Sequence, residues 1–447
     1  MKPEIQPADL AAALGPLELE AGELAALHAR LTTPSRSAVR LNPLGQAVSV
    51  DAVPFAREPV PWFDGPAFWC EAGVRAAAHP LFAAGAYWVQ DAGSLLAVAL
   101  LDPRPGELVC DLCASPGGKA TAILERLGDD GFLLANEVVR SRLGPLVLNL
   151  ARHGSTRWTV TQRDPAALAE AVGPVFDAVL VDAPCTGQSL VARGKQTARA
   201  FDPKQIAHSA ARQQRILDAA VRLLRPGGRL VYSTCTFAWA ENEAQVAGLQ
   251  QRCPTVRSDP LVALAPYAVG GGTPLGCYRL WPHRHDCAGA FAAHLVADDA
   301  VGDPPRTRSS PRLTRPTAAM RQALGEWGEL TNAIRLDVRQ ERLFGWSPGV
   351  PDRWQAIAEA GPEIAHCRGR TWFPSYALAM RRDGAFVPHR TRALSATDVP
   401  RYLTGTDVAV DAVGWTVVTV GELPLGWTKA DGRTGKNQLP KSARLTL

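Results

Sequence analysis

In the middle of the chain, from about residue 86 to residue 300, short apolar runs alternate with longer stretches whose apolar residues have helical spacing. The apolar runs predict strands at Glu107–Cys113, Phe132–Glu137, Arg157–Gln162, Asp177–Asp182 and Arg229–Ser233. The segments Arg140–His153 and Ile206–Leu224 predict amphipathic helices, and we expect Pro226-Gly227-Gly228 to stop the second one. Repeated strand–helix units favour an α/β fold, with a parallel sheet that binds ligands at the carboxyl ends of its strands.

The segments on either side of this region have other patterns. In residues 1–85 a small helical region precedes an irregular stretch with Pro and Trp; its helically spaced leucines are Leu10, Leu14, Leu17, Leu24, Leu27 and Leu31. Residues 301–330 are rich in Pro, Arg and Ser and predict a basic linker followed by a short helix. From residue 331 onward, short strands and turns such as Trp415–Val420 replace the strand–helix alternation.

The composition is that of a globular protein. The 447 residues are 46% hydrophobic and 20% charged, which excludes a disordered or fibrous chain and suggests about three domains. No run approaches the ~18 apolar residues of a membrane span, and the first residues lack the order of an export signal. Nine cysteines at low density favour reduced thiols over a disulfide scaffold. We therefore expect a cytoplasmic protein.

Positive charge is gathered at two places, although the net charge is only +5. No acid lies in the range Pro304–Gly325, which contains Arg306, Arg308, Arg312, Arg315 and Arg321. Near the end of the chain, the range Lys429–Arg444 adds Arg433, Lys436 and Lys441 against a single acid. Such clusters can bind phosphates, but a solvated linker and a solvated tail would give the same pattern.

A glycine-rich turn follows the first of these predicted strands. The range Asp111–Lys119 reads DLCASPGGK, in which Cys113 stands where a phosphate-binding P-loop needs Gly, and the glycines do not follow GxGxxG. An acid lies at or just after the ends of four strands: Asp111, Glu137, Asp164 and Asp182. An acid after the second strand can bind a ribose diol, so S-adenosylmethionine, a nucleoside without phosphates, fits better than a dinucleotide. Each acid alone could instead cap a helix.

Two cysteines come just after neighbouring strands. Cys185 lies in DAPCTG, and Cys235 lies in STCT after the next strand, so both thiols can reach one edge of the sheet. A thiolate that adds to carbon 6 of a pyrimidine makes carbon 5 nucleophilic, and a general base must then remove the carbon 5 proton. Two thiols and an acid suit that chemistry, although cysteines often serve only as small buried apolar residues.

Several longer motifs accompany these residues. In the middle of the chain they are YWVQDAGSLL (Tyr87–Leu96), DLCASPGGKAT (Asp111–Thr121), DAPCTG (Asp182–Gly187), RQQRILDAAVRLLRPGGRLVYSTCTF (Arg212–Phe237), ENE (Glu241–Glu243) and RLWPHRHDCAGAFAAHL (Arg279–Leu295). Near the end they are FPSYALAM (Phe373–Met380), RYLTG (Arg401–Gly405) and GWTVVTVGELPLGWTKADGRTGKNQLPKSAR (Gly414–Arg444). The first set resembles the Sun/RsmF-type RNA (cytosine-5)-methyltransferases, with the paired PC and TC signatures as its specific part. The second set resembles the PUA-type RNA-binding tail of the RsmF-like branch.

The resemblance implies a role for each matching position. Cys235 would be the nucleophile, and Cys185 would assist its release. Glu137 would hold the cofactor ribose, Asp164 would lie beside the adenine, and Asp182 would lie between the cofactor amine and the target base. The remaining cofactor contacts would come from the turn and the helix after the second strand, namely Cys113, Ala114, Ser115, Pro116, Gly117, Gly118, Lys119 and Arg142.

The resemblance also implies a fold, a cofactor and a substrate. Residues 86–300 would form a Rossmann-like methyltransferase domain that uses S-adenosylmethionine, after an N-terminal RNA-binding helical region at 1–85. After the linker at 301–330, residues 331–447 would form an α+β or all-β RNA-binding region, with a PUA-like part at about 395–447. The protein would methylate carbon 5 of a cytosine in RNA, with ribosomal RNA favoured over transfer RNA. It would act as a monomer without a metal.

Some features leave alternatives open. Where the family reads S-G-E-G, residues 186–189 read Thr-Gly-Gln-Ser, so how this loop holds the base is undecided. The mixed cluster Cys277, His283, His285 and Cys287 coincides with the last motif of the family, so we expect no metal site there. A non-catalytic RNA-binding or ribosome-assembly factor on the same scaffold is the rival function, but it would need neither Cys185 nor Cys235.

Overall fold

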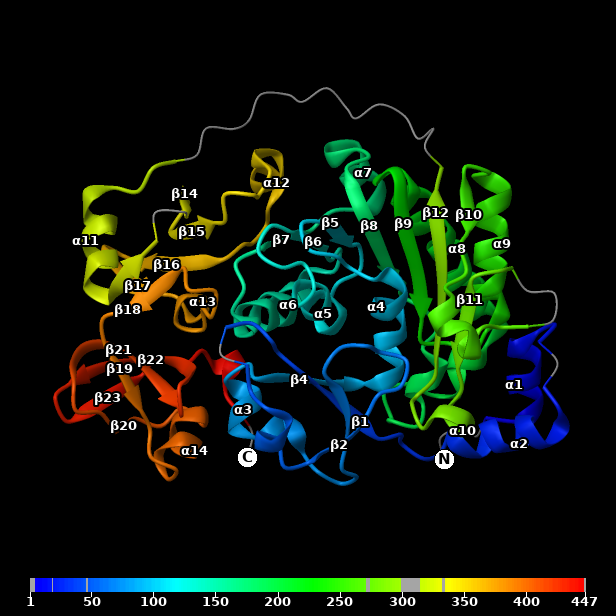
Figure 1. Cartoon of the computed structure of the whole chain (residues 1–447), viewed down its shortest axis with the longest axis horizontal. Coiled ribbons are helices and arrows are strands. Elements are labelled where there is room, and N and C mark those ends of the chain that lie inside the picture. The colour runs from blue at the N-terminus through cyan, green and yellow to red at the C-terminus, as the bar shows by residue number, and fades with distance from the viewer. Residues whose placement is uncertain are drawn as a thin grey trace.

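The computed structural model describes residues 5–17, 19–45, 47–270, 274–298, 314–331 and 334–445. Helices flank a central sheet, a second sheet from the N-terminal region lies beside it, and smaller sheets form the C-terminal region (Figure 1). No helix among the described residues is long and apolar enough to cross a membrane. Arg306, Arg308 and Arg312 lie outside the described residues, so their contacts stay a prediction.

The central sheet has the strand order β10-β12-β9-β8-β5-β6-β7, with β11 paired to β12. Its strands are β5 (Leu108–Asp111), β6 (Phe132–Asn136), β7 (Trp158–Thr161), β8 (Phe176–Asp182), β9 (Leu224–Thr234), β10 (Val256–Ser258), β11 (Cys277–Leu280) and β12 (Ala290–Ala297). Strands β5 to β9 are parallel, as predicted. The other three form an antiparallel edge that was not predicted, because β12 is rich in alanine, which strands disfavour.

The chain reverses direction across this sheet at β5. It runs outward from β5 through β6 to β7, and then returns to place β8 and β9 on the other side of β5. In open sheets of this kind, ligands bind beside the reversal, at the carboxyl ends of the strands. The glycine-rich turn after β5 and the loops after β8 and β9 all lie at that edge.

Helices bury a separate apolar core on each face of the sheet. One core contains residues of α4 (Leu96–Leu101), α5 (Gly118–Leu124) and α6 (Arg140–His153), and the other contains residues of α7 (Pro165–Val172), α8 (Pro203–Val221) and α9 (Glu243–Arg252). The bounds predicted for α6 are confirmed.

The expected stop of α8 at Pro226-Gly227-Gly228 was wrong, because α8 ends at Val221 and this tripeptide lies within β9. Phe176 pairs with Leu224, whereas Ala178 pairs with Arg229, so the Pro-Gly-Gly segment bulges out of the β8–β9 ladder.

The N-terminal region contains more regular structure than its sequence predicted. After α1 (Pro7–Leu14) and α2 (Ala21–Arg30), four strands form an antiparallel sheet in the order β2-β3-β1-β4. They are β1 (Ser37–Leu41), β2 (Ala56–Pro59), β3 (Ala67–Cys70) and β4 (Tyr87–Asp91), with the short helix α3 (Pro80–Ala83) before the last. The irregular stretch expected here was wrong, since β1 and β3 are buried at most positions and so lack the alternation of a half-exposed strand.

The C-terminal region begins with α11 (Ala318–Trp327) and continues into small sheets. The first elements are β13 (Gly328–Leu330), β14 (Arg335–Arg339), β15 (Arg342–Trp346), α12 (Asp352–Ile357), β16 (Glu363–Arg368), β17 (Thr371–Pro374), α13 (Tyr376–Ala379) and β18 (Phe386–Pro388). The last sheet contains β19 (Thr391–Ala393), β20 (Val408–Ala409), β21 (Val413–Val420), β22 (Leu423–Asp431) and β23 (Thr434–Asn437), with α14 (Asp398–Leu403) beside it. Trp415 and Trp427 are buried there.

An aromatic contact joins the C-terminal region to the central sheet. Trp354 of α12 is fully buried against Phe132 and Phe176, the first residues of β6 and β8. Main-chain hydrogen bonds between Val160 of β7 and Ala360 add to this contact. The C-terminal region therefore covers the amino ends of the parallel strands, at the edge opposite the glycine-rich turn.

Candidate active site

The glycine-rich turn is held to the start of α6 by reciprocal hydrogen bonds. Arg142 Nη2 donates to the Ser115 carbonyl at 2.6 Å, and Ser115 Oγ donates to the Arg142 carbonyl at 2.9 Å. Gly117 has a φ of +112°, which disfavours other residues, and a Cβ on Gly118 would lie 2.9 Å from Trp88 Nε1. The glycines therefore let β4 and the turn approach each other closely.

Two adjoining cavities lie at the carboxyl edge of the sheet. The larger, of about 710 Å³, is lined by Glu137, Arg142 and Asp164 among others, and the smaller, of about 440 Å³, by Lys119, Asp182 and both thiols. Cys113, Arg142 and Pro184 line both, so the cavities meet there. Of the predicted cofactor residues, Ser115 and Pro116 line the smaller cavity, whereas Ala114, Gly117 and Gly118 line neither and shape the turn instead.

Two acids line the larger cavity. Glu137 is 4% exposed; its Oε1 accepts from the Val139 amide at 2.8 Å, and its Oε2 lies 3.2 Å from Arg142 Nη1 without full hydrogen-bond geometry. Asp164 caps α7 by accepting from the Ala166 amide at 2.9 Å, which is the helix-capping role that the sequence left open. An oxygen of Glu137 therefore has bonding capacity to spare at the cavity wall.

A third acid, Asp111 at the end of β5, is buried, and neither of its oxygens meets a donor at full hydrogen-bond geometry. Burial raises the pKa of Asp111 to about 7, the charge of Asp182 adds to this rise, and Lys119 opposes it. A buried carboxyl group without donors would gain from a cationic ligand nearby.

An ion pair lies beside the thiols in the smaller cavity. Lys119 Nζ is 2.7 Å from Asp182 Oδ2, and Asp182 Oδ1 accepts from Ser233 Oγ at 2.9 Å. Burial opposes the charge on Lys119, but the partnership with Asp182 raises its pKa overall, so the ammonium form persists. The cavity thus offers a fixed cation and a fixed carboxylate to a bound ligand.

The two predicted cysteines are brought together, with 3.4 Å between Cys185 Sγ and Cys235 Sγ. Their hydrogen bond lowers the pKa of Cys235, and Lys119 lowers it further against the effects of burial and Asp182. The same hydrogen bond and burial raise the pKa of Cys185. Cys235 is therefore the more acidic thiol and the better candidate for a nucleophile.

The loop after Cys185, whose role the sequence left open, is tied to the loop after Cys235. Gln188 is fully buried; its Oε1 accepts from the Phe237 amide at 2.9 Å, and its Nε2 donates to the Ala200 carbonyl at 3.1 Å. The Ser189 amide donates to the Cys235 carbonyl at 3.2 Å. The residues that depart from the family pattern thus hold the backbone of Cys235.

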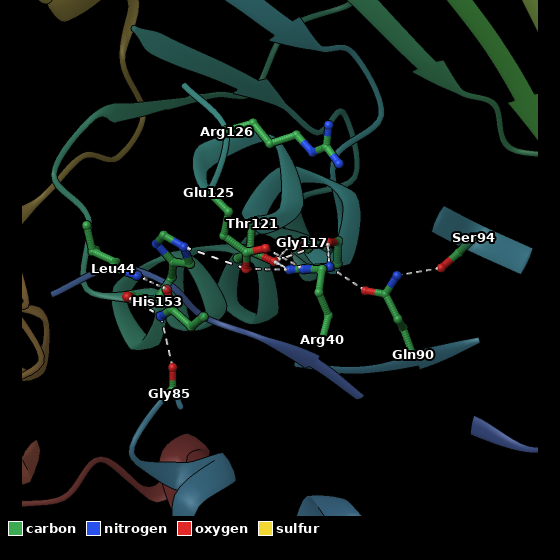
Figure 2. A network of polar contacts seen from close by, with 12 residues as sticks. Arg40, Leu44, Gly85, Gln90, Ser94, Gly117, Thr121, Glu125, Arg126 and His153 are labelled. Carbon is green, nitrogen blue, oxygen red and sulfur yellow. Dashed lines mark hydrogen bonds and ion pairs between the residues drawn. The ribbon is translucent and has the colours of Figure 1, made fainter. Parts of the chain in front are cut away.

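The N-terminal region contributes a residue that the sequence reasoning missed (Figure 2). Arg40 of β1 has a fully buried side chain that donates to both oxygens of Glu125, just after α5, at 2.7 and 3.0 Å. The same guanidinium reaches Thr121 Oγ1 at 2.7 Å and the Gly118 carbonyl at 3.0 Å. The sequence predicted only an irregular stretch around Arg40, and no spacing pointed to a partner 85 residues away.

Asp91 of β4 was also missed, although it lies in the motif YWVQDAG. Its partly buried carboxylate lines the smaller cavity and accepts from Arg193 Nη2 at 2.8 Å and from the Ala288 amide at 2.9 Å. The motif pointed to this segment, but the ion pair of Asp91 with Arg193 could not be predicted, because the two residues are far apart in the sequence. Within the described part of the chain, no group of three His, Cys, Asp or Glu residues could hold a metal ion.

Known proteins match the chain along most of its length. In chain order, the matching families are the N-terminal domain of 16S rRNA methyltransferase RsmF at residues 16–92, 16S rRNA methyltransferase RsmB/F at 98–296, and the methyltransferase RsmF PUA domain at 390–445. Ribosomal RNA small subunit methyltransferase F of Shigella boydii is 31% identical over 438 residues, which cover 91% of this chain and 90% of that protein. The corresponding protein of Escherichia coli has the same identity and coverage.

A solved structure has the same fold over the catalytic part. It is a methyltransferase homolog protein from Pyrococcus horikoshii, 26% identical, with a TM-score of 0.55 over 66% of this chain and 100% of that one. The order of the three matching segments agrees with the sheets seen here, from the N-terminal antiparallel sheet to the last five-stranded one. The chain therefore belongs to the RsmF branch of the RsmB/F family of S-adenosylmethionine-dependent RNA methyltransferases.

Proposed function

We propose that the protein methylates carbon 5 of a cytosine in small-subunit ribosomal RNA, with Cys235 as the nucleophile and Cys185 assisting its release. One observation carries the proposal. Two thiols with pKa values displaced in opposite directions lie 3.4 Å apart in a cavity that adjoins a second, acid-lined cavity. A protein that only bound RNA would have no use for that arrangement.

The acid-lined cavity fits S-adenosylmethionine, a nucleoside that carries a cationic sulfonium and supplies the methyl group. Glu137, with an underused oxygen, would hold the ribose diol, and Asp164 and Arg142 would lie near the adenosine. The carboxyl group of Asp111 lines neither cavity, but it is buried behind their edge without a well-formed hydrogen bond, so its charge would act on the positive charge of the cofactor from a distance. The neighbouring smaller cavity would then hold the target base.

The chain's own groups can carry out the remaining chemistry. The thiolate of Cys235 would add to carbon 6 of the cytosine, and the ammonium group of Lys119 would stabilise the negative charge that this addition places on the ring. Once Cys235 is bonded to carbon, it no longer holds the proton on Cys185, whose hydrogen bond to Cys235 is the largest cause of its raised pKa. Cys185 could then lose its proton to solvent, and its thiolate could take the carbon 5 proton, so that the electrons of the carbon–hydrogen bond restore the ring double bond and the carbon–sulfur bond of Cys235 breaks.

The substrate assignment rests on the names of the relatives and on the C-terminal domain. The related proteins are named for ribosomal RNA of the small subunit, and residues 390–445 match the PUA domain of the same branch. Transfer RNA is the alternative substrate. Incubation of the protein with small ribosomal subunits, free 16S rRNA or transfer RNA, followed by bisulfite sequencing, would distinguish these substrates.

The decisive experiment separates the two thiols. Cys235→Ala should bind RNA but form no covalent adduct and no methylated product. Cys185→Ala should still add and methylate but release slowly, so a denaturant-resistant protein–RNA band should accumulate when S-adenosylmethionine is present. Cys367→Ala, a cysteine far along the chain in β16, is the matched control and should behave like the parent. An adduct with Cys235→Ala alone would reverse the roles, and full turnover by both variants would refute covalent catalysis.

A further inference from the structure

The ENE motif, residues Glu241–Glu243, follows the Cys235 loop and has no part in the chemistry described above. All three side chains are fully buried. Glu243 forms a bidentate ion pair with Arg279, whose Nε donates to Oε1 at 2.6 Å and whose Nη2 donates to Oε2 at 2.7 Å. Asn242 accepts from Thr234 Oγ1 at 2.5 Å and donates to the Thr236 carbonyl at 3.0 Å, so it holds the residues on either side of Cys235.

Glu241 differs from its neighbours because its carboxylate receives donors from two separate loops. Its Oε2 accepts from the Thr186 amide at 3.0 Å and from Gln213 Nε2 at 2.9 Å. Its Oε1 accepts from Thr186 Oγ1 at 2.5 Å and lies 3.5 Å from Thr236 Oγ1. Thr186 directly follows Cys185, and Thr236 directly follows Cys235. The two threonine hydroxyls are themselves 2.9 Å apart.

We propose that Glu241 is a positioning residue for the thiol pair, whose carboxylate joins the residue after Cys185 to the residue after Cys235 and so sets the separation of the two sulfur atoms. The inference rests on the proposed function, since it assigns Glu241 a task in that same site. It adds a carboxylate that touches neither thiol but sets the positions of both.

A role in folding alone would not explain a carboxylate at this position. No Lys or Arg forms an ion pair with Glu241 among the described residues, so its charge is buried without a cationic partner. Such burial costs stability, and a neutral side chain could anchor one loop at a lower cost. A carboxylate can, however, accept from both loops and from Gln213 at once, which an amide cannot do because one of its two ends only donates.

The charge of Glu241 also bears on where the thiol proton lies. In its ionised form Glu241 helps to raise the pKa of Cys185, together with the hydrogen bond to Cys235 and burial. Lys119 acts in the opposite direction on Cys235. The carboxylate on one side and the ammonium on the other therefore favour a proton on Cys185 and a thiolate at Cys235.

The test measures the thiols directly, without RNA or cofactor. The full-length protein is treated with iodoacetamide between about pH 5.5 and 9, and alkylation of each of the nine cysteines is followed peptide by peptide by mass spectrometry. Variants are Glu241→Gln, which removes the charge, and Thr186→Val, which keeps the charge but removes the hydroxyl bonds to Glu241 and Thr236 and leaves the main-chain bond of residue 186 as the remaining link to the Cys185 loop. Glu243→Gln is the matched control, equally buried in the same turn but bonded to Arg279 instead of the thiol loops.

With Glu241→Gln, the midpoint for alkylation of Cys185 should move to lower pH, and that of Cys235 should move the other way as its hydrogen bond weakens. Thr186→Val should keep more of the effect of the charge on the pKa of Cys185 and should loosen the spacing of the two thiols, because one of the two bonds from residue 186 to the carboxylate remains. In methylation assays both variants should lower kcat by about 10- to 100-fold at an unchanged KM for RNA. Glu243→Gln should lower the melting temperature and leave the ratio of the two alkylation rates as in the parent.

Two results would overturn the inference. One is parental pH profiles for both thiols in Glu241→Gln; the other is the same change in Glu243→Gln as in Glu241→Gln, which would indicate general loosening of the turn. Because the alkylation assay needs no methyl transfer, it gives an answer even if the parent protein methylates no RNA. Failure of the proposed function would appear separately, as a parent protein that forms neither adduct nor product.

Discussion

At the scale of single residues, the site is organised around a few charges that lack a full set of partners. Glu137 keeps an oxygen without a well-formed hydrogen bond, and Asp111 keeps two. Lys119 and Asp182, in contrast, satisfy each other at 2.7 Å. Buried polar atoms are normally paired, so the incompletely bonded oxygen of Glu137 at the cavity wall marks a position where a ligand would supply the missing partner.

The first prediction concerns Glu137. Glu137→Ala should weaken S-adenosylmethionine binding, because it removes charge-assisted hydrogen bonds of about 1.5–3 kcal/mol each. Isothermal titration calorimetry should show a loss of affinity of at least about tenfold, at a similar number of sites. Asp164→Ala is the comparison, and it should also lower thermal stability because it removes the cap of α7. Unchanged affinity in Glu137→Ala would exclude the ribose assignment.

The second prediction concerns the pH dependence of cofactor binding. In the free protein the pKa of Asp111 is about 7, so the carboxyl group is mostly protonated below that pH and ionised above it. A cationic ligand favours the ionised form, and affinity should therefore rise with pH between about 6 and 8, by up to about tenfold per unit below the pKa. Titrations of the parent and of Asp111→Asn across this range provide the measurement.

The amine of the cofactor titrates identically with both proteins, so the difference between the two slopes isolates Asp111. The variant should show the flatter profile. Parallel profiles would mean that Asp111 does not sense the bound cation.

At the scale of elements, the turn after β5 depends on supports from both of its neighbours. Arg142 at the start of α6 holds Ser115 from one side, and Arg40 of β1 holds Gly118 and Glu125 from the other. The N-terminal sheet therefore supports the proposed cofactor site, although it contributes no residue to the larger cavity.

The third prediction follows from the Arg40–Glu125 pair. Arg40→Met leaves a buried carboxylate without its cation, which should lower the free energy of unfolding by about 3–5 kcal/mol. Denaturant titration measures that loss, and calorimetry should show weaker S-adenosylmethionine binding because the turn is no longer held. The double variant Arg40→Met/Glu125→Leu should recover a large part of the stability, since no charge is left unpaired. If it recovered cofactor affinity as well, the pair would have no positioning role.

Elements could be predicted from the sequence where the pattern of apolar residues within the segment itself was sufficient. The parallel strands and α6 could be predicted because each has an apolar run or a helical repeat in its own sequence. Cys185 and Cys235 come shortly after two of these strands, so their position at the same edge of the sheet could be predicted as well. Strands β1, β3 and β12 lacked a regular pattern, because β1 and β3 are buried at most positions and β12 is rich in alanine. Arg40, Asp91 and Glu241 act through partners that lie far away along the chain, and a sequence without its fold does not pair them.

At the scale of the whole molecule, a row of basic residues crosses the C-terminal sheet. Lys429 of β22 lies directly opposite Lys436 of β23, and its Nζ is 5.8 Å from the ring centre of Trp415 on β21. Like charges placed opposite each other on neighbouring strands destabilise a sheet unless an anion lies between them. The pair therefore favours the phosphate-binding interpretation of the basic tail over that of a merely solvated one.

The fourth prediction tests that interpretation. Replacement of Lys429, Arg433 and Lys436 by Gln should weaken binding to RNAs of any sequence, and the slope of log affinity against log salt should fall by about 0.7–0.9 per lost phosphate contact. Filter binding at several salt concentrations provides the measurement. The matched control replaces Arg104, Arg225 and Arg252, each of which already pairs with an acid. An identical slope in both triple variants would mean that the tail charges are only solvated.

The contact of Trp354 with Phe132 and Phe176 has a practical consequence for how such a protein can be dissected. A chain cut in the linker would leave the two phenylalanines at the ends of β6 and β8 facing water, together with the apolar surface around them. The shortened catalytic domain would then aggregate or unfold, and its inactivity would say nothing about RNA recognition. In this protein the C-terminal region stabilises the central sheet besides any contact that it makes with RNA, so single surface substitutions are the way to separate the two tasks.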